Sequence, residues 1–475
     1  RIGLLPASSM NRTTGRRAGC LALPILCLLS VLSGTAAGET QAIYGALTPA
    51  SETLRACTLP EMTPGKVLLE TDCRYTEPVV ISSDNILLDC RGGTITGMHR
   101  RGITIRPGLK NITIRDCRLD DTGGILIEGQ TPSDDAAARD EARANSSQGV
   151  VLDHLTITKS YMTGVFVDHY VVGATIRNSI VADGHHVGIY LEHGSQKNVV
   201  SGNLIRNNGL FTNKGIRRIG PTRREGLSVD GSAYNLIENN IFDSNAFGGI
   251  FHYKNCWEFH TTNPESRPRL QGSDGNVIRG NVFRNMDIGI WVASRQARDL
   301  VMWDCGDKSP YDSPVSLAPM MGDRPWGQSD TFLGYHFNPE LIAGFVDKNA
   351  LAPRWPFPME LHLYEDFAED NTYQDNCFEN LVTGIRIEDD GNTVRDNLFV
   401  GDFEYLYLGS PFRANMLNRP IEGTVIEGNK NASPSSRSFL QNSFLAADEH
   451  KDTVIVQPDA GSSVPAPDTC KTGQT

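Results

Sequence analysis

Acidic side chains recur at one position of a repeated segment. The segment begins with Gly and continues with alternating aliphatic residues, as in Gly164-Val-Phe-Val-Asp168 and Gly188-Ile-Tyr-Leu-Glu192. The fourth residue after the Gly is acidic in five of seven such segments, which end at Glu128, Asp168, Glu192, Asp230, Tyr253, Ala293 and Glu388. Carboxylates repeated in this way indicate proton transfer or cation binding.

Three of these acids, Asp168, Glu192 and Asp230, lie in consecutive segments. If the segments are adjacent strands about 4.8 Å apart, the carboxylates form a ladder of like charges. Such a ladder can hold a cation, raise the pKa of one member, or stay solvated and screened. We take the three as catalytic candidates and as the ligands of a Ca²⁺ ion.

Further candidates share the predicted face of the acidic ladder. General acid–base chemistry needs a group that can take or give a proton, and the residues we expect in this role are Tyr190, His193 and Lys254. Flat aromatic and charged side chains suit sugar rings, and the residues we expect to bind substrate are Phe166, Tyr253, Trp291, Arg386 and Glu388.

The elements that position these residues are short strands. In each segment the first and third residues after the Gly are aliphatic, which predicts that they point inward while the second and fourth point outward. A motif with paired Asn recurs as well, and its shortest spacing, Asn371 to Asn392, is 21 residues. That period fits a coil of three strands and three turns, so we predict an all-β, right-handed parallel β-helix. Gly and Asn suit left-handed corners, and stacked Asn residues are expected to bond one another in a ladder.

The predicted organisation has four parts. Residues 1–37 are expected to be a signal peptide, 38–80 an N-terminal cap, 81–430 the β-helix, and 431–475 a C-terminal cap or flexible tail. Four insertions, at about 129–148, 209–224, 255–275 and 296–370, border the acidic strands. Loops on one face of a solenoid commonly form the walls of its binding surface.

An apolar run from Leu21 to Leu32 follows several Arg residues and precedes small residues, as in an export signal. We expect a secreted or periplasmic monomer with no membrane span in the mature chain. Eight Cys would remain, and an even number in an exported chain predicts disulfides. The pairs we expect are Cys57–Cys73, Cys90–Cys117 and Cys256–Cys305.

The formal net charge of the chain is −12, and removing the predicted signal would make it more negative because that segment carries Arg residues and no acid. A nucleic-acid-binding surface needs a basic footprint, so nucleic acid is not an expected partner.

The rung from Asn85 to Gly97 resembles the opening rung of the bacterial right-handed parallel β-helix repeat proteins, and the resemblance extends over residues 65–430. That family includes polysaccharide lyases, alginate epimerases, glycoside hydrolases and copper-site maturation proteins, so it implies a fold more narrowly than a function. The acidic ladder resembles the calcium site of pectate-type lyases. The segments Gly164 to His169 and Gly188 to Glu192 resemble those of alginate epimerases, although their Asp-Pro-His signature would fall on Phe166-Val-Asp168.

These resemblances imply a polysaccharide as the partner and, first, a lyase or epimerase that acts on an acidic (uronate) glycan. A β-helix glycoside hydrolase is the second reading, because two carboxylates at rung spacing suit glycoside hydrolysis. The third is a β-helix without catalytic activity that serves in adhesion or polysaccharide export.

Overall fold

The computed structural model describes residues 54–130, 136–211, 222–253, 271–292, 331–332, 335–336, 368–409, 421–431, 454–455 and 470. The predicted signal peptide lies outside these residues, as does most of the longest insertion.

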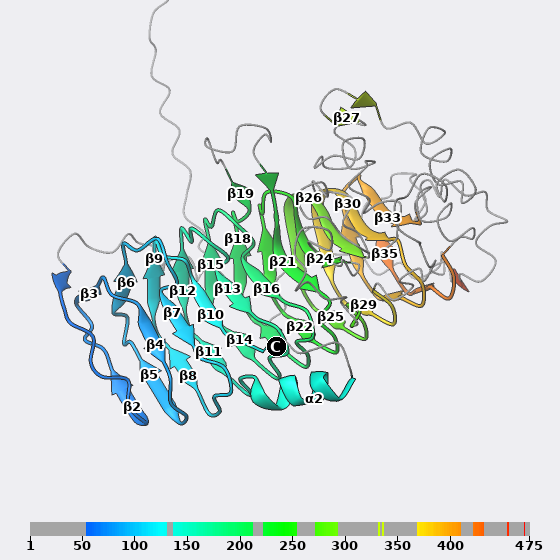
Figure 1. Cartoon of the computed structure of the whole chain (residues 1–475). Coiled ribbons are helices and arrows are strands. Elements are labelled where there is room, and N and C mark those ends of the chain that lie inside the picture. The colour runs from blue at the N-terminus through cyan, green and yellow to red at the C-terminus, as the bar shows by residue number, and fades with distance from the viewer. Residues whose placement is uncertain are drawn as a thin grey trace, which may run out of the picture. The chain divides into compact units, whose positions relative to one another are not determined.

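The described chain forms a coil in which each turn contributes one strand to each of three columns (Figure 1). Column 1 consists of β2 (Gly65–Leu68), β5 (Ile86–Asp89), β8 (Thr113–Arg115), β11 (Val151–Asp153), β14 (Thr175–Arg177), β17 (Val199–Ser201), β22 (Leu236–Glu238), β25 (Val277–Arg279), β29 (Thr372–Gln374), β31 (Thr393–Arg395), β34 (Val425–Glu427) and β36 (Val454–Ile455). Column 2 contains β1 (Arg55–Ala56), β3 (Cys73–Tyr75), β6 (Thr94–Thr96), β9 (Arg118–Asp120), β12 (Thr156–Thr158), β15 (Ile180–Ala182), β18 (Leu204–Arg206), β23 (Ile241–Asp243), β32 (Leu398–Val400) and β35 (Lys430–Asn431). Column 3 carries the acidic segments and contains β4 (Val79–Ile81), β7 (Ile103–Ile105), β10 (Ile125–Ile127), β13 (Val165–Val167), β16 (Ile189–Leu191), β21 (Glu225–Asp230), β24 (Gly248–Tyr253) and β33 (Glu404–Leu408).

Two long strands, β26 (Val282–Val292) and β30 (Cys377–Ile387), run from column 2 into column 3. All pairing within the columns is parallel and in register, as in Val165↔Ile189 and Ile189↔Leu227. This arrangement is the predicted parallel β-helix. Strands β1 to β4 already pair within it, so the stacking reaches into the segment expected to be an N-terminal cap.

Buried Asn residues hold the corners together. One ladder runs through Asn198, Asn235, Asn276, Asn371 and Asn392, and a second runs through Asn203, Asn240, Asn281, Asn376, Asn397 and Asn429. In both ladders each side-chain nitrogen donates to the side-chain oxygen of the Asn on the next rung, at 2.8–3.2 Å. The predicted ladder is therefore confirmed, and its role is structural.

Replacing Asn240 by Ala is expected to lower the free energy of unfolding by roughly 2–4 kcal/mol, because it leaves buried backbone and amide groups without partners. Asn240 accepts from the main chain and side chain of Asn203 and donates to the carbonyl of Val200 and to Asn281. Urea unfolding measures the loss. Gln374→Ala, at a partly exposed amide, is the control and should cost under about 0.5 kcal/mol. Equal losses for the two variants would contradict the structural role of the ladder.

The strand Gly residues have a different role from the one expected. Most of them do not have a positive φ. Gly is needed there because a Cβ would lie too close to atoms of the neighbouring rung. A Cβ on Gly289 would lie 2.5 Å from the carbonyl oxygen of Gly384 and 2.7 Å from the ring of Phe378. Positive φ occurs instead at other corner residues, such as Lys197 and Gly202. The strand Gly therefore permits close approach between rungs.

The interior is apolar, as the alternation predicted. Val165, Val167, Ile189 and Leu191 are all fully buried in one core cluster. Toward the C-terminal rungs the interior of column 2 is a stack of Phe rings. Phe242, Phe283, Phe378 and Phe399 follow one another with ring centroids 4.9–5.0 Å apart.

Among the described residues, three disulfides join parts of the coil. Cys57–Cys73 and Cys90–Cys117 are present as predicted, and the second joins adjacent rungs. Cys470 pairs with Cys377 of β30, so the C-terminal segment is tied to the coil and Cys470 is not a lone thiol. The pair predicted between Cys256 and Cys305 lies outside the described residues and stays a prediction.

The insertions border column 3 where they are described. Helix α2 (Ala136–Asn145) follows β10, and the antiparallel hairpin of β19 (Leu210–Phe211) and β20 (Thr222–Arg223) leads into β21. A second antiparallel hairpin pairs β27 (Thr331–Phe332) with β28 (Tyr335–His336). A search of the described residues finds no helix with the length and apolar character needed to cross a membrane.

Candidate functional site

The outward face of column 3 changes character along the coil. On β10, β13 and β16 the residues at the second position, Leu126, Phe166 and Tyr190, are half-buried. From β21 onward the same position is buried, beginning with Ser228 and Phe251. Only the earlier rungs of the described face therefore offer this position to a ligand.

Four predicted substrate-binding residues lie in the buried part. Tyr253 and Trp291 belong to an aromatic cluster that is separate from the coil interior. Arg386 forms an ion pair with Glu388 and lies 4.8 Å from the centroid of the Trp291 ring, and both charged residues are 1 % exposed. These contacts stabilise the outer face, and the assignment of the four residues to substrate binding stays a prediction.

Phe166, Tyr190 and Asp230 lie together, as their place in the columns predicted. The rings of Phe166 and Tyr190 stack at 5.2 Å with an interplanar angle of 20°. The hydroxyl of Tyr190 donates a short hydrogen bond to Oδ2 of Asp230, whose residue is fully buried. A half-buried phenol is thereby joined to a buried carboxylate that can accept its proton.

Asp168 is paired with His169, the next residue in the chain. Its Oδ1 lies 2.6 Å from Nδ1 of His169, and Oδ2 accepts the main-chain N–H of Gly129. Burial raises the pKa of Asp168, but the hydrogen bond and charge of His169 outweigh it and lower the pKa below the usual value. Asp168 is therefore ionised at neutral pH and holds the His169 ring at Nδ1.

Glu192 and His193 are buried on the next rung. The carboxylate of Glu192 accepts the main-chain N–H of His193 at 2.8 Å. Nε2 of His193 lies 3.4 Å from the hydroxyl of Tyr170, whose ring is in turn contacted by the guanidinium of Arg143 from α2. The structure thus places His193 in a packed network, and its predicted catalytic role stays a prediction.

Glu225 was missed by the sequence reasoning. It is 1 % exposed and accepts hydrogen bonds from Tyr253 at 2.6 Å, from Ser228, and from Arg224 at 3.2 and 3.3 Å. It precedes the strand Gly of β21, at a position that pairs with Gly248 on the next rung. Reading the residue before each Gly as a further column would have found it.

Arg101 was also missed, because the repeat was read only from Gly124 onward. Its Nη1 donates to the carbonyls of Gly123 at 2.7 Å and Thr163 at 3.0 Å, and its guanidinium lies 5.5 Å from the centroid of the Phe166 ring. The side chain therefore crosses from the rung of β7 to the rung of β13, beside the Phe166–Tyr190 stack.

The bonding of the acidic ladder bears on the predicted Ca²⁺ site. Asp168, Glu192 and Asp230 each accept a hydrogen bond from a protein donor. In the described part of the chain, they are not among the carboxylates whose oxygens gather within 4.8 Å of one another. Calcium prefers several such oxygens in one shell. The described structure therefore does not gather the ladder oxygens into one shell, and the Ca²⁺ site stays a prediction.

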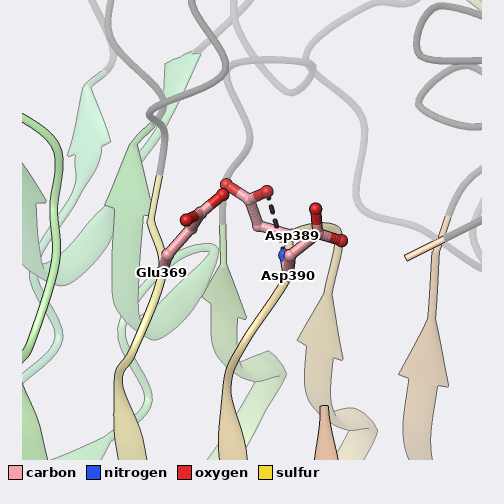
Figure 2. A group of neighbouring side chains, drawn as sticks. All are labelled: Glu369, Asp389 and Asp390. Atoms are coloured by element: carbon pink, nitrogen blue, oxygen red, sulfur yellow. Dashed lines mark hydrogen bonds between the residues drawn. The ribbon is translucent and has the colours of Figure 1, made fainter. Parts of the chain in front are cut away.

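The acids that do gather are Glu369, Asp389 and Asp390, which come from neighbouring corners of the coil (Figure 2). Both oxygens of Asp389 accept main-chain N–H groups, from Ala368 and from Asp390, each at 2.9 Å. Oδ1 of Asp390 accepts from the main chain of Glu422 at 2.8 Å. These bonds fix successive corners of the coil.

His252, the third residue after the strand Gly249, is fully buried. Burial lowers its pKa to about 3, an effect that the backbone of Ser273 opposes, and its ring packs edge-on against Tyr373. Among the described residues, neither ring nitrogen has a hydrogen bond of good geometry.

This lowered pKa predicts acid sensitivity. The unfolded chain, with a histidine pKa of about 6.5, binds the proton more tightly than the fold, so stability is full above that value and falls as the pH drops toward 3. We expect wild type to lose about 2–3 kcal/mol more than His252→Leu between about pH 7 and about pH 4.5, measured by urea unfolding. Parallel profiles of unfolding free energy against pH for the two proteins would contradict this predicted acid sensitivity.

The remaining predicted catalytic residue, Lys254, lies outside the described residues and stays a prediction.

Comparison with known proteins supports the fold. A family profile described as the right-handed beta helix region matches residues 136–296. No curated protein matches the sequence significantly. With the parallel columns described above, the match confirms the predicted right-handed parallel β-helix.

Solved structures of similar fold act on polysaccharides. The A-module of the mannuronan C-5 epimerase AlgE4 of Azotobacter vinelandii is 11% identical, with 83% of this chain and 91% of that chain covered and a TM-score of 0.44. The PL6 family polysaccharide lyase Pedsa3628 of Pseudopedobacter saltans is 12% identical, with 82% and 89% covered and a TM-score of 0.37. The catalytic domain of a GH87 alpha-1,3-glucanase is 10% identical, with 82% and 63% covered and a TM-score of 0.35. At these identities the likeness concerns the fold alone.

Proposed function

We propose that this chain is a carbohydrate-active enzyme that removes the C5 proton of a uronate in an acidic polysaccharide, and so acts as a lyase or epimerase. The observation that carries the proposal is the pairing, on the outward face of column 3, of half-buried Tyr190 with Asp230 and of His169 with Asp168. The two pairs supply an acceptor and a donor of protons on one face.

The proposed reaction uses these pairs in turn. The phenol oxygen of Tyr190 takes the C5 proton while the hydroxyl proton of Tyr190 passes to Asp230. In lysis the C4–O4 bond then breaks, a C4–C5 double bond forms, and protonated His169 gives its proton to O4. In epimerisation the C4–O4 bond stays intact, and protonated His169 gives its proton to C5 on the opposite face of the ring.

The spacing of the two pairs suits this chemistry. Phe166 and Tyr190 are in register on adjacent strands, and Asp168 lies two residues beyond Phe166. Strand spacings of about 4.8 Å and about 3.3 Å per residue place the two pairs on the order of 8 Å apart. A sugar ring bound between them can meet one pair at C5 and the other at O4.

Glycoside hydrolysis fits the carboxyl groups of this site less well. It needs one carboxyl group that stays protonated and acts as the acid, with a raised pKa. The pKa of Asp168 is lowered, and Asp230 and Glu225 already accept hydrogen bonds from Tyr hydroxyls. Elimination or epimerisation is therefore the reading that the hydrogen bonds favour.

The test measures exchange of the C5 proton with deuterated water, followed by NMR, over a panel of alginate, polygalacturonate and polyglucuronate. Exchange is expected on one member of the panel, together with ultraviolet absorbance from unsaturated ends if the reaction is lysis. A hydrolase would release reducing ends without exchange. A non-catalytic adhesion or export protein would bind a polymer and leave it unchanged, and either result would contradict the proposal.

We also propose that the protein works as a monomer in an oxidising compartment, secreted or periplasmic. The three disulfides support this location, since such bonds persist mainly in oxidising compartments. The apolar segment Leu21 to Leu32 is the proposed export signal.

A further inference from the structure

Positively charged side chains approach the Tyr190 site from the side where the column 3 strands begin. We propose that Arg101 and Arg224, on either side of His186, bind the carboxylate of the uronate and neutralise it with protein cations. This inference rests on the proposed function and names the binding residues of the same site.

Arg101 is the stronger of the two observations. Its two hydrogen bonds go to neutral main-chain carbonyls, those of Gly123 and Thr163. Within the described ranges no carboxylate lies at ion-pair distance from it. Burial lowers its pKa to about 10, against the opposing charge of Asp168, so it stays ionised at neutral pH. A fixed, partly desolvated guanidinium of this kind is suited to a carboxylate, which it can bind through two parallel hydrogen bonds.

Arg224 lies before β21, on the rung that follows that of His186. It follows the hairpin of β19 and β20, and its guanidinium contacts Glu225, a carboxylate that Ser228 and Tyr253 share. Burial, followed in order by the charges of Arg224, His185 and Arg101, lowers the pKa of His186 to about 4. Both guanidinium groups therefore act on the same half-buried imidazole.

The register of the strands sets the length over which Arg101, His186 and Arg224 extend. Arg101 bonds Thr163 just before β13, His186 lies just before β16, and Arg224 lies just before β21. These are three consecutive rungs of column 3, so the groups extend over about 10 Å. That length accommodates one sugar carboxylate and the ring that carries it.

The position also fits the chemistry. Arg101 lies over Phe166, whose ring stacks on Tyr190. A carboxylate held by Arg101 thus places the adjacent C5 beside the Tyr190 phenol. Neutralising that carboxylate makes the C5 proton more acidic.

Equilibrium binding tests the inference separately from turnover. Isothermal titration is carried out after dialysis against EDTA, with tetrasaccharides of mannuronate, guluronate, galacturonate and glucuronate and with the carboxyl-reduced form of each. Wild type is expected to bind one acidic tetrasaccharide at least about tenfold more tightly than its reduced form. Arg101→Gln and Arg224→Gln should each remove that preference, and Arg100→Gln, at the exposed neighbouring arginine, should keep it.

The controls separate folding and catalysis from recognition. Arg101→Gln also removes hydrogen bonds to two carbonyls, so the thermal midpoint of this variant is measured. If Arg101→Gln does not fold, Arg224→Gln is the variant that tests the inference. Equal affinity for acidic and reduced sugars, a preference kept in Arg224→Gln, or a preference that appears only with added Ca²⁺ would each overturn the inference. Absence of C5 exchange in a protein that shows the expected binding pattern would instead contradict the proposed reaction and leave the carboxylate site standing.

Discussion

Tyr190→Phe is expected to lower turnover by about 100- to 10,000-fold while affinity for the polysaccharide changes little. The substitution keeps the ring that stacks on Phe166 and removes only the hydroxyl that bonds Asp230. Asp230→Asn should cause a loss of similar size. The measurement is the rate of C5 proton exchange on the polymer that wild type accepts.

Because Tyr190 and Asp230 are proposed to act as one unit, the double variant should lose little more than either single variant. Tyr161→Phe is the matched control, since Tyr161 is exposed and should keep full turnover. If Tyr190→Phe retains more than about a tenth of the wild-type rate, the proton relay through Asp230 is wrong. Strictly additive losses would mean that the two residues act separately.

Phe283→Ala is expected to lower the free energy of unfolding by about 3–5 kcal/mol. Phe283 is fully buried and lies in the middle of the Phe stack, between Phe242 at 5.0 Å and Phe378 at 4.9 Å. Its ring also lies against the strand Gly249, so its removal opens a cavity that rigid neighbours on both rungs cannot fill. Urea unfolding, followed by circular dichroism, measures the loss.

Phe283→Leu keeps most of the volume and should cost distinctly less than the Ala variant. Leu210→Ala, at an exposed hairpin residue, should change stability by under about 0.5 kcal/mol. A solenoid can also unfold in parts, because each rung contacts only its neighbours. Equal effects of Phe283→Ala and Phe283→Leu would show that the stack relaxes around a cavity and that the rigid-stack argument fails.

The fold could be predicted from the sequence because every rung of a coil repeats the same local structure. Inward Val165 and Val167, the ladder at Asn240, and the pair Cys90–Cys117 all follow from period and alternation. Each involves residues on one rung or on the next, so counting along the chain predicts the contact. The strand Gly was misread because close approach, as at Gly289, depends on the neighbouring rung and on Phe378 across the interior.

The candidate site was predicted only in part. Phe166, Tyr190 and Asp230 meet as their columns indicated, since register alone brings them together. Arg101 and Glu225 were missed, because they lie before the strand and reach the face from the corners.

By itself, the sequence determined which residues share a face, because strand periodicity and rung length fix direction and register. Only the tertiary structure decided which part of that face is open, since Tyr190 is half-buried while Trp291, in the same column, is buried. It also decided that each ladder carboxylate has its own donor, such as Tyr190 for Asp230. Burial and pairing depend on side chains from different rungs and insertions meeting in space, and the periodicity of a single strand does not specify those contacts.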